Sequence, residues 1–393
     1  MKLNTTSKAT VYNRKQLIAI CIPIVCALQH GNANDSIPAD RIRIEASYSG
    51  DMVRNFAGGQ KRGNAYLGII DFGIGFNTEN LGLWKGGEFV VQVENTHGAT
   101  PTADLVGDLQ VFSNIENGDY SYLYMAWYRQ TLGNLSILAG IHDLNSEFHI
   151  TEFSGNLINS AFGIMSAASL NFPVPIFPKT AFGTLVSFKV SEKIGMITGV
   201  YDGDPYDLDN EKYNLGHTLN KEQGLLSITE IHIHNPAKFL NGTYKLGFQY
   251  HSAKFTDLSD TTKLIEGNRG IYFLADHNLI SYEDGLQLGC FLQLGYAPGL
   301  CNINPFYLGT GFTCSNFFLS RPDDILSLGI AYAGINREIP GMLNSETSIE
   351  LSYLLQLHPN ISLQPDIQYI INPGAVNSIK NAIVGMIRIN INN

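Results

Sequence analysis

Charged side chains recur on alternate residues of several segments in which apolar and polar residues also alternate. Arginine and lysine donate hydrogen bonds and carboxylates accept them, so a ring of both signs suits a neutral polyol better than an ion. The candidate charges are Arg43, Glu45, Asp71, Glu94, Arg129, Lys189 and Lys245. Arg43 and Arg129 rank first because a guanidinium presents several donors in a fixed fork. The alternative interpretation is that each charge is only part of a solvated wall.

A second candidate group lies in the segment Asp143–Thr180, which is far longer than an ordinary connection and rich in Asn, Ser, Phe and Pro. Its first residues include Asp143, Asn145, Glu147 and Phe148. Carboxylate and amide groups would bond to the hydroxyl groups of a polyol, and the ring of Phe148 would pack against an apolar C–H face of such a solute. The alternative is that Asp143 and Asn145 cap the turn that leaves the preceding strand.

The elements that would position these groups are β-strands. In the last segment Ile383, Ile387 and Ile389 share one parity, while Arg388 and Asn390 share the other. A period of two predicts a strand with two different faces. The predicted strands are Arg41–Ser49, Leu67–Asn77, Glu88–Asn95, Tyr120–Arg129, Leu135–His142, Ala181–Val190, Ile194–Asp202, Leu225–His234, Thr243–Ser252, Gly270–Asn278, Leu286–Tyr296, Ile303–Thr313, Ile325–Gly334, Glu346–Leu357, Ile361–Tyr369 and Ala382–Asn392.

Two different faces on every strand indicate two different solvents, lipid outside and water inside. The predicted fold is an all-β, transmembrane antiparallel β-barrel of about 16 strands. An even strand count returns both chain ends to one side, where the connections should be short, as periplasmic turns are.

Long connections are predicted on the opposite side of the barrel, with one short exception at Pro298–Asn302. The long ones are Gly50–Tyr66, Thr96–Asp119, Asp143–Thr180, Gly203–Gly224 and Ala253–Arg269. Connections of the length of Asp143–Thr180 are usually functional. We expect this segment to fold inward and narrow the lumen.

The N-terminus has the pattern of a bacterial secretory signal peptide. Four basic residues and no acid precede an apolar run from Leu17 to Leu28, and small residues up to Ala33 suit cleavage. The predicted domains are a signal peptide over residues 1–33 and a barrel over residues 34–393. The predicted location is the bacterial outer membrane, with membrane lipid as the surrounding partner.

Charge excludes some functions. Removing the four basic residues of the leader from the 25 in the chain leaves 21 against 35 acids, a net charge of −14. No basic patch remains that would indicate a nucleic-acid partner. Charged residues form 15% of the chain, against about 25% in typical soluble domains. This deficit favours a surface that largely faces lipid.

Other residue groups allow chemistry that we do not favour. Three cysteines remain after the leader, so at least one is unpaired; Cys290 lies on an apolar parity, and a bridge between Cys301 and Cys314 stays open. His232 and His234 share a face, but a third metal ligand is not evident. We predict neither a cofactor nor a metal site.

An acidic run follows one strand end, and oxygen-rich loops can hold calcium. Its members are Asp202, Asp204, Asp207, Asp209 and Glu211. The run lacks the glycine placement of an EF-hand, so a solvated extracellular loop is the preferred interpretation.

Several short motifs occur in order along the chain. They are Val106–Gln110, Ser113–Ile115, Asp143–Phe148, Phe177–Thr180, Tyr201–Gly203, Arg321–Asp324 and Pro365–Gly374. Together with the barrel pattern, these motifs resemble those of the carbohydrate-selective outer-membrane porins of the OprB type. The resemblance implies a monomeric barrel of sixteen strands that lets sugars, glucose in particular, diffuse down their gradient. Outer-membrane barrels usually end in an aromatic residue that the assembly machinery recognises, whereas this chain ends in Ile391, Asn392 and Asn393.

The sequence therefore predicts a sugar-selective porin without enzymatic activity. The alternatives are a general diffusion porin of similar architecture, an outer-membrane barrel enzyme and a secreted soluble β-protein. Neither a GxSxG elbow nor an HExxH helix occurs, which argues in part against the enzyme.

Overall fold

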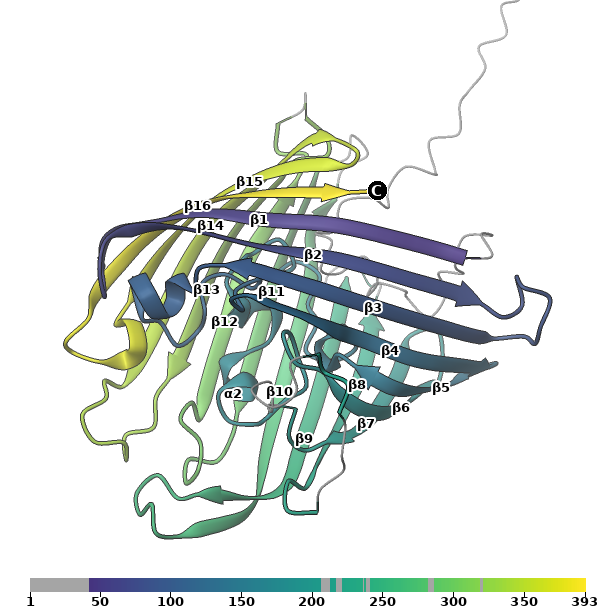
Figure 1. Cartoon of the computed structure of the whole chain (residues 1–393), viewed down its shortest axis with the longest axis horizontal. Coiled ribbons are helices and arrows are strands. Elements are labelled where there is room, and N and C mark those ends of the chain that lie inside the picture. Colours follow the sequence, from purple (N-terminus) through teal and green to yellow (C-terminus); the bar gives the residue numbers. More distant parts are fainter. Residues whose placement is uncertain are drawn as a thin grey trace, which may run out of the picture.

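The chain forms a closed antiparallel barrel (Figure 1). The computed structural model describes residues 42–205, 213–216, 221–235, 237, 241–281, 286–318 and 321–393; the predicted leader lies outside them. Within these residues each strand is hydrogen-bonded to its neighbours in sequence, and β1 pairs with β16. The predicted number of sixteen strands is confirmed for the described part of the chain. The strands are β1 (Ile42–Gly59), β2 (Gly63–Asn77), β3 (Gly87–Gly98), β4 (Tyr120–Leu132), β5 (Leu135–His142), β6 (Ala181–Lys189), β7 (Ile194–Asp202), β8 (Leu225–Asn235), β9 (Gly242–Thr256), β10 (Leu264–Ser281), β11 (Gln287–Tyr296), β12 (Phe306–Ser315), β13 (Ile325–Gly334), β14 (Ser345–His358), β15 (Ile361–Ile371) and β16 (Lys380–Asn392).

Successive side chains point outward and into the lumen in turn. On β2, Ile70, Phe72 and Ile74 are 46%, 42% and 39% exposed because they face outward, whereas the inward-facing Leu67 and Ile69 are buried. Such an apolar outer surface is unfavourable in water and matches hydrocarbon. The alternation that predicted two solvents is therefore present in the barrel wall.

The connections differ in length at the two rims. Residues 133–134, 190–193 and 359–360 make short turns at the rim where Ser47 of β1 pairs with Asn392 of β16. Residues 99–119 and 143–180 make long loops at the opposite rim. These two are called the second loop (99–119) and the long loop (143–180) below.

Two predicted connections were wrong. β1 does not end at Ser49 but continues to Gly59, so residues 60–62 replace the predicted loop Gly50–Tyr66. The alternation of inward and outward side chains continues there, since Asp51 is buried on the inside and Met52 is 54% exposed on the outside. The sequence pattern does not reveal this extension. Beyond the apolar belt, the inward and the outward positions both include polar residues. Likewise residues 257–263 replace Ala253–Arg269. The predicted connection Pro298–Asn302 lies within the observed connection 297–305.

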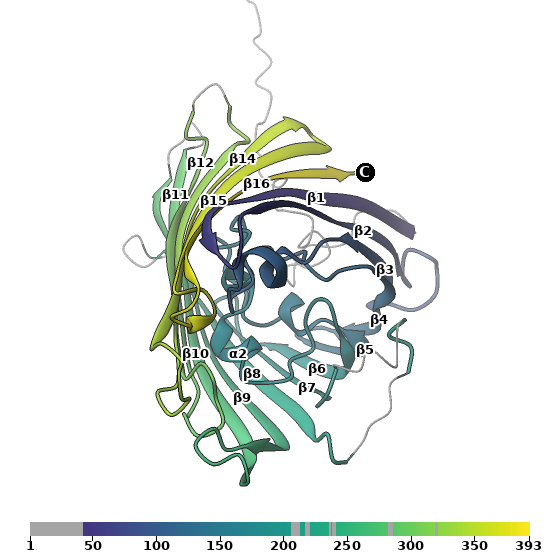
Figure 2. The same cartoon turned by 60° about the vertical axis from the view of Figure 1, so that its left-hand side comes forward.

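The long loop lies inside the barrel, as predicted (Figure 2). It contains η3 (Leu144–Ser146), α1 (Ser160–Gly163) and α2 (Ser166–Ser169). Its apolar side chains, with Phe148 and Phe162 fully buried, pack against inward-facing residues of the wall. The second loop, with η2 (Thr102–Val106), packs against another part of the wall through Phe112 and Ile115. Among the described residues, no helix is long and apolar enough to cross a bilayer.

The three cysteines of the described chain are free. Cys314 is in β12, near the rim of the short turns, and Cys301 is in the connection 297–305 at the opposite rim. The bridge between them that the sequence left open does not form because the length of β12 separates the two thiols. Cys290 lies on the outward parity of β11, as its apolar neighbours predicted.

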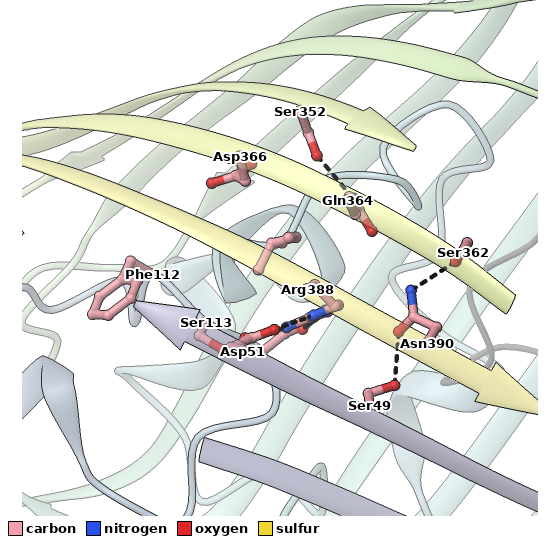
Figure 3. Close-up of polar contacts among 12 residues, drawn as sticks. Ser49, Asp51, Phe112, Ser113, Ser352, Ser362, Gln364, Asp366, Arg388 and Asn390 are labelled. Atoms are coloured by element: carbon pink, nitrogen blue, oxygen red, sulfur yellow. Dashed lines mark hydrogen bonds and ion pairs between the residues drawn. The ribbon is translucent and has the colours of Figure 1, made fainter. Parts of the chain in front are cut away.

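A buried ion pair crosses the seam where the barrel closes (Figure 3). Asp51 of β1 lies opposite Arg388 of β16. Arg388 donates from Nε to Oδ1 over 2.7 Å and from Nη2 to Oδ2 over 2.8 Å. Ser113 of the second loop donates to the same carboxylate over 2.7 Å, and Asn114 accepts from Arg388 over 2.8 Å. The pair therefore joins the seam to the second loop.

Replacing Arg388 with glutamine should destabilise the barrel because it leaves the Asp51 carboxylate buried without its counter-charge. Breaking one partner of a buried pair costs about 3–5 kcal/mol. The measurement is the temperature at which the protein shifts to its unfolded position on a detergent gel. The double variant Asp51→Asn with Arg388→Gln should recover part of the loss. Equal stability of wild type and Arg388→Gln would contradict this role.

Candidate functional site

The long loop is held in the lumen by carboxylates of the barrel wall. A loop inside a barrel needs acceptors for its backbone N–H groups. Asp276 of β10 accepts from the N–H groups of Glu152 and Phe153 over 2.9 and 3.0 Å. Glu350 of β14 accepts from Ile158 and from Asn159, the latter over 2.9 Å. These contacts fix the loop by its backbone.

Further wall residues extend the attachment. Glu230 of β8 accepts from the N–H of His149 over 3.3 Å, and Lys245 of β9 donates to the carbonyl of Ile150 over 2.9 Å. Lys245, predicted as a lumen charge, is therefore an anchor of the long loop.

The second loop is held in the same way. Glu346 of β14 accepts from the N–H groups of Leu109 and Gln110 over 2.8 and 3.0 Å. The amide of Gln368 on β15 donates to the carbonyl of Phe112 over 2.8 Å. Together the two loops attach to wall residues from β8 round to β1.

Charged groups on β1 and β4 remain partly exposed. Arg43 and Glu45 form an ion pair of 2.8 Å with side chains 28% and 30% exposed. Arg129 of β4 forms an ion pair with Glu147 of the long loop, and their side chains are 27% and 26% exposed. Strand alternation brings Arg43, Glu45 and Arg129 to the lumen, and the inward loop brings Glu147.

Sequence reasoning missed Glu88. It is on β3, directly opposite Arg129 in register, and it interacts electrostatically with Arg43, Arg129 and Glu147. We call Arg43, Glu45, Glu88, Arg129 and Glu147 the charged ring. Glu88 has the inward parity of Glu94, so the same alternation that selected Glu94 was a signal for it.

Asp71 and Glu94 lie beside the charged ring in a network on β1 to β4. Asp71 accepts from Ser47 over 3.1 Å and from Gln92 over 3.2 Å. Glu94 is buried and accepts from the hydroxyl of Tyr122 over 2.7 Å. The two residues face the lumen as predicted, but their oxygens are engaged with neighbouring wall residues.

Of the four candidates in the long loop, only Glu147 reaches the charged ring. Asp143 accepts from the N–H of Asn145 over 2.9 Å and caps η3. Asn145 donates to the carbonyls of Phe148 and Gly163 over 3.0 and 3.1 Å. Phe148 is completely buried in the core of the loop, so its ring has no face free for a sugar. The capping alternative describes Asp143 in this structure.

The remaining candidates do not gather at one place. Lys189 pairs with Glu192 over 3.0 Å, near a short turn. His232 pairs with Glu230, and His234 lies 3.4 Å from the hydroxyl of Thr243. The described residues hold no group of three or more His, Cys, Asp or Glu placed to share a metal. Asp202 and Asp204 are described, whereas Asp207, Asp209 and Glu211 lie outside the described residues.

Glu116 is an unusual carboxyl group in the second loop. It accepts from the N–H of Thr102 through both oxygens, over 3.0 and 3.1 Å, at the start of η2. Burial raises the pKa of Glu116 to about 7, although the bonds from Thr102 oppose the rise. The carboxyl group therefore titrates near neutral pH.

A family model matches most of the chain. The profile described as "Carbohydrate-selective porin, OprB family" matches residues 61–392. Porin B of Pseudomonas aeruginosa is 23% identical over 402 residues, which cover 88% of this chain and 86% of that protein. The putative porin QuiX of Acinetobacter baylyi is 19% identical over 419 residues, covering 92% and 91%.

Solved structures share the barrel fold. The high-pH structure of OprB from Pseudomonas putida superposes with a TM-score of 0.82 at 18% identity, covering 90% of this chain and 94% of that chain. The outer-membrane channel DcaP of Acinetobacter baumannii superposes with a TM-score of 0.53 at 11% identity, covering 89% and 97%.

The second loop should pack less firmly as the pH rises. Because the pKa of Glu116 is about 7 in the folded loop against an ordinary 4.5, the folded loop retains a proton that the opened loop releases between these values. Its stability therefore falls as pH rises through this window. The measurement is the hydrogen-exchange rate of the loop amides in the wild type divided by the rate in Glu116→Gln, taken at each pH. A ratio that is constant with pH would contradict it.

Proposed function

Because the chain belongs to the OprB family of carbohydrate-selective outer-membrane porins, we propose that it passes monosaccharides such as glucose through the charged ring. The sugar moves down its own concentration gradient. Family and fold are those of a channel rather than of an enzyme. Export by a cleaved leader over residues 1–33 and function as a monomer are parts of the same proposal.

The charged ring is the observation that carries this proposal. Arg43 and Arg129 offer several N–H donors, while Glu45, Glu88 and Glu147 offer carboxylate acceptors close to them. A sugar hydroxyl both donates and accepts, so it can bond to either kind of group. Two positive and three negative groups leave the ring with a net charge of −1. That charge favours neutral sugars over anions.

The ring also accounts for rapid transit. The charges of the ring are already paired with one another. A passing sugar therefore replaces existing hydrogen bonds instead of only adding new ones. The net free energy of such an exchange is small, about 0.5–1.5 kcal/mol for each bond. Conduction needs sites that are attractive enough to admit a solute and weak enough to release it.

Removing either ring arginine should weaken glucose binding in the pore. In planar bilayers, Arg43→Ala and Arg129→Ala should raise the glucose concentration that halves the current by about tenfold, the effect of losing one charged hydrogen-bond partner. Liposome swelling should show faster disaccharide uptake through the wider ring. Lys189→Met is the matched control because it removes a lumen charge outside the ring.

Unchanged glucose block and unchanged swelling in both arginine variants would contradict the assignment of the ring. Equal swelling rates for monosaccharides and disaccharides in the wild type would favour a general diffusion porin instead.

A further inference from the structure

Trp127 lies directly beneath an arginine of the charged ring. It precedes Arg129 by two residues on β4, so both side chains face the lumen. The guanidinium carbon of Arg129 is 5.1 Å from the centre of the Trp127 ring. A cation held over an indole face is attracted by the negative face of the ring, and the attraction grows as water is excluded. Trp127 itself is only 9% exposed.

The indole is fixed from behind by residues of β5. The ring of His142 meets it edge to face, with centroids 6.2 Å apart. Opposite Trp127 in register is Gly140, at a φ of +145°. A side chain at Gly140 would come within 2.6 Å of the Trp127 Cα. The absence of a side chain therefore lets the tryptophan lie close against β5.

The same support reaches the partner of Arg129. One ring nitrogen of His142 lies 3.2 Å from the Tyr201 hydroxyl, and the other lies 3.0 Å from the Ser146 hydroxyl. Ser146 immediately precedes Glu147, which pairs with Arg129. Trp127 and His142 thus connect both members of this ion pair to one group of contacting residues.

The contribution of Trp127 lies in its ring face rather than in its polar atom. The indole N–H is buried and finds no acceptor among the described residues. Packing alone therefore holds the ring, and phenylalanine could supply a similar face to Arg129.

We propose that Trp127 is the positioning residue of the charged ring, holding the Arg129 guanidinium so that its donors face the passing sugar. This inference rests on the proposed function. Without the aromatic face, Arg129 still carries its charge, but its donors are no longer fixed toward the lumen. Trp127 then affects sugar binding without touching the sugar.

Fluorescence offers a direct test because the chain has only two tryptophans. Trp84 is 48% exposed in the turn between β2 and β3, outside the charged ring. In Trp84→Phe protein, Trp127 is the sole indole. Glucose should change the fluorescence emission of Trp127. The glucose concentration that gives half of this change should equal the one that halves the current. Arg129→Ala in the Trp84→Phe background should abolish the change. Emission that ignores glucose while the current is blocked would overturn the proposal.

Substitution of Trp127 gives the second readout. Trp127→Leu should raise the half-blocking glucose concentration about 2- to 30-fold, the range expected for a lost cation–π contact. Trp127→Phe should restore most of the affinity. Heat-modifiable migration on a detergent gel identifies the variants that fold. If Trp127→Leu does not fold, the fluorescence titration still tests the proposal.

The two proposals fail in different ways. If Arg129→Ala weakens glucose block while folded Trp127→Leu does not, the positioning role is wrong and the proposed function stands. If Arg43→Ala, Arg129→Ala and Trp127→Leu all leave the block unchanged, the charged ring itself is not the sugar site.

Discussion

The structure depends on one constraint: a loop folded into a barrel must find acceptors for its backbone N–H groups. An N–H group left without an acceptor costs about 1–3 kcal/mol when buried. Here the acceptors are carboxylates on the inward faces of the strands, chiefly Asp276, Glu350 and Glu346. Asp276 and Glu350 each take two neighbouring N–H groups of the long loop, and Glu346 takes two of the second loop.

This attachment makes the lumen asymmetric. Backbone groups of the two loops bond to wall residues of β8, β9, β10, β14 and β15, and apolar residues of both loops pack against the wall. The charged side chains of β1, β3 and β4 stay partly exposed. A pathway lined by a fixed loop and by paired charges is polar. Polar lining groups are one property that a selective channel for small neutral solutes requires.

Much of the barrel could be predicted from sequence because alternation of side chains is a direct consequence of strand geometry. The same rule selected Arg43, Glu45 and Arg129, whose inward direction follows from parity alone. It does not apply inside an irregular loop, so Phe148 could not be placed as buried. Nor does parity tell an acid that binds a loop backbone from one that faces water. The loop partners of Asp276 and Glu350 are also more than a hundred residues away in sequence, so the sequence alone did not identify these two residues as anchors.

The position of glucose in the lumen can be determined from a structure of the protein with the sugar bound. We expect the sugar to lie among Arg43, Arg129 and Glu147, with hydroxyl groups about 2.7–3.2 Å from their nitrogens and oxygens. We also expect the long loop to remain bonded to Asp276 and Glu350. Glucose bound elsewhere in the lumen, or a long loop lifted from these two carboxylates, would contradict these expectations.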